Sequence, residues 1–259
     1  MAVDTAARKP LLNDPWLEPY RLVIERRAEA AAARARRLAE GPGTLAEFAC
    51  AHEFYGLHRT AGGGWVFREW APRATALWLV GDFSSWEMRG PFRASRLPGR
   101  DVWEVRLPAD AVRHGQYYRL EMMWEGGRGE RLPAYARRVV QDAQTGIFTA
   151  QVWDPPEPYR WRHPFRVPRR PPLIYECHIG MAQETCGIGT YEEFRRQVLP
   201  RIINGGYNTI QIMAVMEHPY YASFGYQVSS FFAASSRFGT PEELKALIDA
   251  AHGTGVAVI

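Results

Sequence analysis

The sequence predicts a multidomain protein in which a helical arm and an all-β sandwich precede a βαβαβ unit of parallel strands. Three changes of pattern along the 259 residues indicate this order: an alanine- and arginine-rich stretch, then short β-rich runs between turn residues, then apolar runs alternating with helix-start motifs. A proline-rich stretch separates the last two patterns. We place the boundaries at residues 1–45 for the arm, 46–153 for the sandwich, 154–172 for the linker and 173–259 for the βαβαβ unit.

The arm is predicted to be helical from Pro15 to Ala39 because alanine, arginine and glutamate are strong helix formers, and Gly41-Pro42-Gly43 ends it. Glutamates interrupt its densest group of arginines, so the charges are expected to spread over a solvated face and no nucleic-acid site is predicted. That group consists of Arg26, Arg27, Arg34, Arg36 and Arg37.

Short strands separated by turn residues predict the β-sandwich. The predicted strands are Trp65 to Phe67, Ala76 to Val80, Val102 to Leu107, Gln116 to Trp124, Arg138 to Gln141 and Phe148 to Trp153. After them, seven prolines between Asp154 and Pro172 favour an extended linker along the surface.

The βαβαβ unit is predicted from strands at Leu173 to Ile179, Asn208 to Val215 and Val256 to Ile259. Capping boxes at Thr190-Tyr191-Glu192-Glu193 and Thr240-Pro241-Glu242-Glu243 begin the two connecting helices. Such crossovers require parallel strands. Because both faces of a parallel strand are normally buried and no helix follows Ile259, we expect the chain to be an N-terminal fragment.

The segment from Met216 to Gly239 is unusually long for a connection after a parallel strand, where active-site loops lie in barrels. Its residues 217–227, the tyrosine-rich loop, combine flat aromatic rings with hydrogen-bonding groups, as a sugar site requires. The alternative is that Tyr220, Tyr221, Phe224 and Tyr226 only pack the loop onto the barrel rim.

The loop also carries a family resemblance. The run from Gly206-Tyr207-Asn208-Thr209-Ile210-Gln211, through Glu217-His218-Pro219-Tyr220-Tyr221-Ala222-Ser223-Phe224-Gly225-Tyr226-Gln227, to Phe238-Gly239-Thr240-Pro241 closely resembles 1,4-α-glucan (glycogen) branching enzymes. These belong to the α-amylase superfamily, and the YYASFGYQ form is similar to the eukaryotic-type branch. The resemblance implies glycogen biosynthesis as the setting and a (β/α)8 TIM barrel, of which this chain holds the first part.

Other segments agree in order. Ile174 to Gly180 is similar to the first barrel strand of the family, with Cys177 where serine or leucine is more usual. Phe67-Arg68-Glu69-Trp70-Ala71-Pro72 and Gly81-Asp82-Phe83-Ser84-Ser85-Trp86 resemble its isoamylase-type carbohydrate-binding module. The resemblance covers about Leu12 to Ile259.

The resemblance implies α-1,4-glucan as partner and a set of binding residues. Tyr226 matches the tyrosine that stacks on the sugar next to the cleavage point. Tyr221, Ala222, Ser223 and Phe224 match the loop lining the glucan groove, and Trp70, Ala71 and Pro72 match a contact away from the active centre. The alternative for Trp70 is burial in the sandwich core. Trp86 and Trp124 are left out, because branching enzymes do not reliably use that face of the module.

The implied reaction cleaves an α-1,4 bond with retention, through a covalent glucosyl-enzyme, and transfers the cut chain to a 6-hydroxyl. The family's catalytic residues are an aspartate after the fourth strand, a glutamate after the fifth and an aspartate after the seventh. None lies within Met1 to Ile259, so we expect no catalytic residue here and no branching activity from this chain alone. Glu176, expected in the barrel interior, and Glu217 are not assigned as a substitute pair because nothing sets their separation.

Two alternatives remain open: a non-catalytic α-glucan-binding protein, and a related debranching or trehalose-releasing enzyme. We expect no cofactor and no metal, since Cys177, His178 and Cys186 lack a fourth ligand at a structural spacing. The odd, small number of cysteines and the lack of a signal pattern or an apolar membrane span predict a cytoplasmic protein without a membrane partner.

Overall fold

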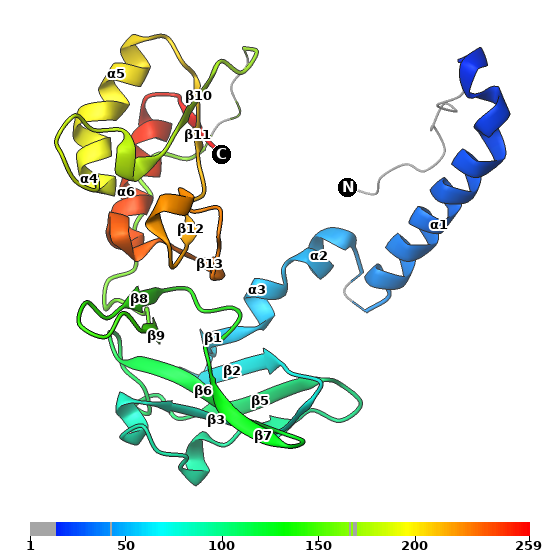
Figure 1. Cartoon of the computed structure of the whole chain (residues 1–259), viewed down its shortest axis with the longest axis vertical. Helices are drawn as coiled ribbons and strands as arrows, with labels where there is room; N and C mark the ends of the chain where they lie inside the picture. The colour runs from blue at the N-terminus through cyan, green and yellow to red at the C-terminus, as the bar shows by residue number, and fades with distance from the viewer. Residues whose placement is uncertain (1–13, 42, 166, 168–169) are drawn as a thin grey trace. The chain divides into compact units, whose positions relative to one another are not determined.

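The computed structural model describes residues 14–41, 43–165, 167 and 170–259, which belong to two compact units, Met1–Ala51 and His52–Ile259 (Figure 1). In the first unit a 3-10 helix, Pro15–Tyr20, continues into α1 (Arg21–Ala39), and α2 (Leu45–Ala49) follows. Side chains cap these helices: Asp14 accepts from the Trp16 N–H at 2.9 Å, and Thr44 accepts from the Glu47 N–H at 3.1 Å. The predicted helix is therefore present, with a 3-10 first part.

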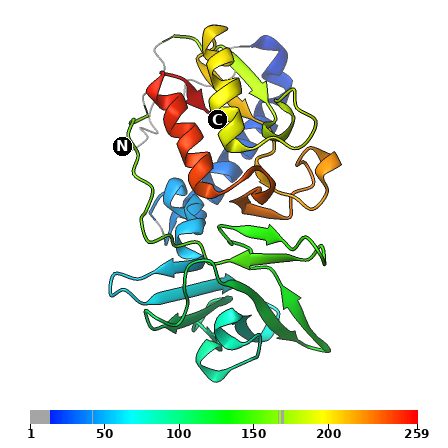
Figure 2. The same cartoon turned by 90° about the vertical axis from the view of Figure 1, so that its left-hand side faces the viewer.

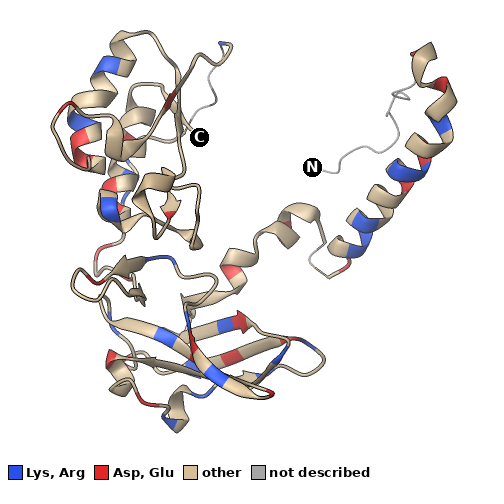
Figure 3. Ribbon diagram, viewed as in Figure 1, with Lys and Arg blue, Asp and Glu red and all other residues tan. Residues whose placement is uncertain are grey.

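The arginines of α1 lie on a solvated surface. No residue of this helix is buried, and Figure 3 shows basic and acidic positions interleaved along its ribbon. An ion pair between Glu18 and Arg21 lies just ahead of its first turn. The charges thus neighbour one another along the helix instead of forming one basic stripe.

The boundary between the units falls within α3 (Ala51–Phe54), and the second unit continues with a sandwich of two antiparallel sheets. One sheet has the order β1-β2-β5-β4, with bounds Gly56–Arg59, Trp65–Trp70, Val102–Leu107 and Ser95–Arg96. The other has the order β3-β6-β9-β8, with bounds Ala74–Gly81, Tyr117–Trp124, Phe148–Gln151 and Val139–Gln141, and β7 (Gly127–Arg131) also pairs with β6.

Alternation along the strands explains the core of the sandwich. Val105 and Leu107 of β5 are buried while Arg106 between them is exposed, as expected for a strand with one face inward. Phe67 from β2 and Leu77 from β3 are fully buried in the same apolar cluster. Burial of such side chains from both sheets holds the module together.

Three parallel strands follow, β10 (Ile174–Cys177), β11 (Thr209–Ile212) and β14 (Ala257–Val258), in the order β10-β11-β14. Between them lie a helical segment made of α4 (Tyr191–Glu193), a π-helical part (Phe194–Val198) and α5 (Leu199–Asn204), and then α6 (Pro241–Gly253). Figure 2 shows α5 and α6 side by side, and Ile202 and Leu247 from these helices pack with Ile210 of β11. The predicted βαβαβ order is therefore present.

Both predicted capping boxes form. Thr190 accepts from the Glu193 N–H at 3.1 Å, and the Glu193 carboxylate accepts from the Thr190 N–H at 2.8 Å. Thr240 and Glu243 make the equivalent bonds at 3.2 and 2.6 Å at the start of α6. Each box satisfies two backbone donors that the first helical turn leaves free.

Three details depart from the sequence prediction. The helix after β10 widens into a π turn, in which Leu199 N–H donates to Phe194 O, just before Pro200, whose ring would clash with a carbonyl of the preceding turn. The second strand ends at Ile212, ahead of Ala214 with its φ of 41°. The long segment after it contains a hairpin, β12 (Met216–Glu217) and β13 (Ser230–Ala234).

The proline-rich segment is fastened to α6 by Asp249, whose side chain is fully buried. Asp249 accepts from the Tyr159 hydroxyl at 3.0 Å, from the Arg162 side chain at 3.0 Å and from the His163 N–H at 2.9 Å. Burial opposes ionisation of Asp249, but the hydrogen bonds from Arg162, His163 and Tyr159 outweigh it and hold the pKa well below the ordinary aspartate value. The linker is therefore held at one buried carboxylate.

Replacing Asp249 by asparagine should release this segment. We expect Asp249→Asn to lower the free energy of unfolding by about 1–3 kcal/mol and to speed hydrogen exchange at the Arg162 and His163 amides, because both lose a charged acceptor. Glu157→Gln, an exposed carboxylate of the same segment, is the matched control. Since the folded pKa is lowered, the contribution of Asp249 is present above its ordinary pKa of 3.8 and is lost only as the pH falls through the lower folded value. Unchanged amide exchange in Asp249→Asn would contradict this account.

Candidate functional site

The base of the tyrosine-rich loop is built around the buried side chain of Glu217 in β12. Its carboxylate accepts from the Ser236 N–H at 2.7 Å, the His218 N–H at 3.1 Å and the Ser235 hydroxyl at 3.3 Å. These bonds join the start of the hairpin to its end. Glu217 is therefore held in a structural role and does not face solvent.

The loop bends sharply at its tip. A 3-10 turn, Tyr221–Ser223, ends at Phe224, which has a φ of 53°, and Gly225 follows with a φ of 85°. A Cβ atom at Gly225 would lie 2.4 Å from the Ala214 carbonyl oxygen. Glycine is thus required at this position both by its backbone conformation and by the close approach of Ala214.

Five of the predicted binding residues lie together in this loop, at the carboxyl ends of β10 and β11. Tyr226 is 67% exposed, Phe224 and Ala222 are exposed, and Tyr221 and Ser223 are half-buried. The Ser223 hydroxyl donates to Tyr220 O at 2.7 Å and is thus used within the loop. The aromatic rings are the main groups that the loop turns outward. The 67% exposure of Tyr226 does not fit packing onto the rim, whereas Phe224, although exposed, also contacts the His178 ring.

Two histidines lie beneath the loop. His178, at the end of β10, contacts Tyr221, Phe224 and Phe238 edge-on, with ring centroids 6.0, 6.1 and 5.4 Å away. Burial, with His218 nearby, lowers the pKa of His178, so the ring is neutral near pH 7. A neutral ring packed against three aromatic groups supports the loop from below.

The other three predicted residues lie on the module, at the end of β2. Trp70 is 60% exposed, which excludes the sandwich-core alternative for this residue. The backbone at Trp70 is held in place by the buried Glu69 carboxylate, which accepts from the Trp70 N–H at 3.0 Å and from the Ala134 N–H at 2.9 Å. Ala71 is buried, and its carbonyl accepts from the Trp103 indole at 2.9 Å, while Pro72 is half-buried.

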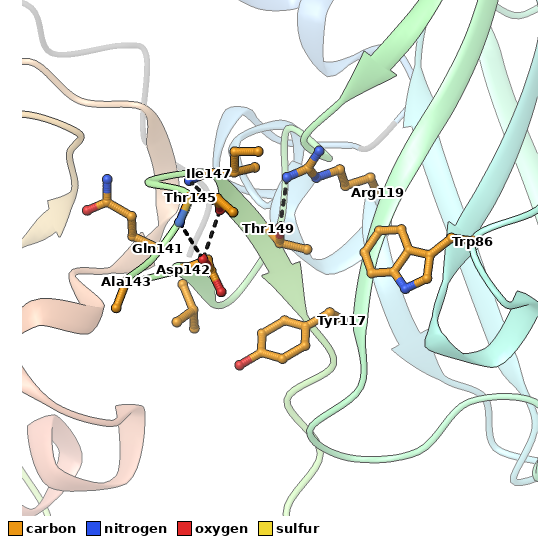
Figure 4. Close-up of a pocket in the computed structure, with 10 residues that line it drawn as sticks. Trp86, Tyr117, Arg119, Gln141, Asp142, Ala143, Thr145, Ile147 and Thr149 are labelled. Carbon is orange, nitrogen blue, oxygen red and sulfur yellow. Dashed lines mark hydrogen bonds between the residues drawn. The ribbon is translucent and has the colours of Figure 1, made fainter.

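A further site, which the sequence analysis left out, is a pocket of about 480 Å³ on the second sheet of the module (Figure 4). We name it the module pocket. Its aromatic side is Trp86, 43% exposed, with Tyr117, and its polar side is the segment from Gln141 to Thr149 with Arg119. It is lined by Trp86, Tyr117, Arg119, Val140, Gln141, Asp142, Ala143, Thr145, Ile147 and Thr149.

Asp82 fixes the aromatic side of the module pocket. One carboxylate oxygen accepts from the Trp86 indole N–H at 3.1 Å, and the other accepts from the Tyr117 N–H at 2.7 Å. Trp86 has a φ of 62°, a backbone conformation that bulky side chains rarely adopt. Trp124, the other tryptophan considered for this face, does not line the pocket; it packs against the β6–β7 turn with Arg131 over its ring at 5.0 Å.

The polar side of the module pocket is equally constrained. Arg119 donates to the Thr149 hydroxyl at 2.9 Å, and Asp142 accepts from the Thr145 N–H at 2.7 Å (Figure 4). Arg119 also donates to Phe148 O at 2.9 Å. A flat ring facing fixed donors and acceptors is the arrangement that a sugar requires.

Comparison with known proteins finds similarity both in the module and along most of the chain. Residues 54–136 match the family model of carbohydrate-binding module 48 (isoamylase N-terminal domain). The chain is 42% identical over 255 residues to the 1,4-alpha-glucan-branching enzyme of Rhizophagus irregularis, covering 95% of this chain and 37% of that protein. The enzyme of the same name from Dictyostelium discoideum is 41% identical over 262 residues, covering 98% of this chain and 38% of the relative. The expected resemblance to branching enzymes is confirmed.

The fold has wider counterparts. The pullulanase from Bacillus acidopullulyticus superposes with a TM-score of 0.64 at 18% identity, over 79% of this chain and 28% of that structure. A Group B Streptococcus pullulanase gives 0.64 at 17% identity, over 79% and 32%. The chain spans well under half the length of these two branching enzymes.

The carboxylates considered earlier do not form a catalytic pair of the branching-enzyme kind. Glu217 is buried and hydrogen-bonded as described. Glu176 lies on β10 and is exposed, contrary to the expected interior position, and its nearest polar contact is the Gln211 amide at 3.4 Å. A retaining pair needs two carboxylates facing one sugar. Glu176 is exposed, but Glu217 is buried and cannot face one.

Within the described residues, no group of three or more histidine, cysteine or acidic side chains is placed to hold a metal ion. Cys177 is buried, and this burial, with Glu176 nearby, raises the pKa of its thiol to about 12. Among the helices of the described part of the chain, none is long and apolar enough to cross a membrane.

The glycine at the loop tip provides a test of this geometry. We expect Gly225→Ala to destabilise the fold by about 1–3 kcal/mol and to increase chymotrypsin cleavage in the tyrosine-rich loop, because the added Cβ meets the Ala214 backbone. Gly62→Ala is the control, since an added Cβ there meets no atom within 4 Å. Equal cleavage of the two variants would show that the loop tip is not constrained in this way.

Proposed function

We propose that this chain is the glucan-recognising N-terminal part of a 1,4-alpha-glucan branching enzyme, which cleaves α-1,4 and forms α-1,6 linkages by a retaining mechanism. The single observation that carries the proposal is the exposed ring of Tyr226 on a braced loop at the carboxyl ends of β10 and β11. In a (β/α)8 barrel that edge of the sheet faces the active site. The sequence similarity of 41–42% supports the same assignment.

The proposed division of labour gives this chain binding and leaves bond cleavage to residues outside it. Tyr226 stacks on one sugar, and Tyr221, Ala222, Ser223 and Phe224 line the groove beside it. A second contact is offered by Trp70, Ala71 and Pro72. It is supported by the exposure of the Trp70 indole and by the hydrogen bond that holds the Trp70 backbone to Glu69. We add Trp86 and the module pocket as a third.

The alternative, a non-catalytic α-glucan-binding protein, is favoured by one observation. The module pocket contains an aromatic platform and fixed polar groups without any residue of the βαβαβ unit. A protein that only binds glucan could use that pocket alone, whereas a branching enzyme also needs the tyrosine-rich loop.

Calorimetric titration of the 259-residue chain with maltoheptaose tests the proposal and separates the two functions. We expect Trp86→Ala and Tyr226→Ala each to weaken binding roughly five- to tenfold, the loss of one stacked ring. Trp16→Ala, which removes an 86% exposed tryptophan of the first unit, is the control and should bind as the wild type does. Binding that depends on Trp86 and not on Tyr226 would favour the non-catalytic alternative, and no measurable binding by the wild type would contradict both.

A further inference from the structure

Arg237 joins two parts of the molecule that are far apart in sequence. It lies in the 3-10 turn Ser236–Phe238, directly after β13. Its guanidinium donates to the carbonyl oxygens of His218 at 2.8 Å and Pro219 at 3.0 Å, and also to the Gln141 side-chain oxygen at 3.0 Å. One side chain therefore holds the start of the tyrosine-rich loop and the end of β8 in the module.

Gln141 is itself part of the module pocket. While its oxygen accepts from Arg237, its amide nitrogen donates to Gly146 O at 2.9 Å. That second bond closes the turn from Asp142 to Gly146, whose residues form one wall of the pocket. The wall of the pocket and the entry of the loop are thus two hydrogen bonds apart.

Other contacts between the module and the hairpin do not make this connection. Tyr135 stacks on Phe232 with ring centroids 4.4 Å apart, and Arg138 donates to Gly239 O at 3.1 Å. These contacts fasten the module to β13 and to Gly239, two residues before α6, but neither contacts the tyrosine-rich loop or lines the pocket. They hold the module and the hairpin together, so that a small displacement of the Gln141 side chain also displaces the Arg237 guanidinium.

The guanidinium is suited to this connection because its donors are fixed in one plane and reach several acceptors at once. A lysine ammonium in the same place would keep the charge but could not hold three acceptors in this planar arrangement. The link therefore depends on arginine as such and not on positive charge alone.

We propose that Arg237 is a positioning residue that couples the module pocket to the tyrosine-rich loop. An α-glucan segment bound in the pocket fixes the Asp142–Gly146 turn, and through Gln141 and Arg237 this fixes the His218–Pro219 backbone from which the loop rings project. The coupling is reciprocal, so an ordered loop also favours binding in the pocket. The proposal rests on the proposed function only in that the pocket takes α-glucan.

Hydrogen exchange with and without saturating maltoheptaose tests the coupling in the 259-residue chain carrying Tyr226→Ala, which removes the loop's own stacking contact with glucan, and binding is measured in parallel by calorimetry. In this Tyr226→Ala background, into which each variant below is also introduced, we expect the amides of residues 220–227 to exchange roughly fivefold more slowly with ligand. In Arg237→Lys the Trp86-dependent binding should remain while this slowing is lost. Arg138→Lys, an arginine of the same contact region that does not contact Gln141, is the matched control and should keep the slowing.

Two further variants keep the outcomes separate. Gln141→Ala removes the acceptor and leaves Arg237 on the loop, so it should also lose the slowing even if Arg237→Lys fails to fold. Trp86→Ala should lose it because the pocket is no longer filled. Loop slowing that persists in Arg237→Lys or in Trp86→Ala would overturn the coupling, whereas a wild type without Trp86-dependent binding would overturn the pocket's part in the proposed function.

Discussion

Glu217 is the buried charge on which the base of the tyrosine-rich loop depends. A carboxylate without solvent must be satisfied by donors, and here these are the Ser235 hydroxyl and the N–H groups of His218 and Ser236. Since these donors lie on both sides of the hairpin, the loop between them is closed at its base. The exposed rings of Phe224 and Tyr226 are presented from a fixed support because of this closure.

The module is hydrogen-bonded to the residues next to Glu217. Arg237 extends from the residue after Ser236 and holds the two carbonyls that follow Glu217, and it reaches the module through Gln141. Burial lowers the pKa of Arg138, and the nearby Glu217 carboxylate partly offsets this effect. The two aromatic surfaces, one on each part of the second unit, are therefore joined by a small set of polar contacts.

Local rules predict much of this fold from the sequence. The threonine and glutamate of each capping box locate the two helix starts, and the spacing of turn residues locates the sandwich strands, because these signals act within a few residues. The hairpin within the long segment is harder to predict, since its register is set by the burial of Glu217 and not by alternation. Pro200 indicates a disturbed helix, but the π turn that accommodates it follows from packing.

The candidate site likewise has residues that the local sequence predicts and residues whose positions depend on the folded structure. The five loop residues lie close in sequence and were predicted together, whereas the exposure of Trp70 depends on Glu69 and Ala134, which only the folded module brings together. The family resemblance gives no reason to include Trp86, because branching enzymes do not reliably use that face of the module. The position of Trp86 in the pocket depends on an unusual backbone conformation and on Asp82, neither of which a sequence pattern specifies. Glu176 was expected inside a closed barrel, and its exposed position reflects a sheet of three strands.

We propose that two aromatic surfaces of this chain, at Trp86 and at Tyr226, recognise α-glucan. A crystal structure of the 259-residue chain with bound maltoheptaose tests it most directly. The account predicts sugar rings stacked on Trp86 in the module pocket and on Tyr226 in the tyrosine-rich loop, with the Arg237 hydrogen bonds intact. Glucan bound elsewhere, with both of these rings free, would contradict it.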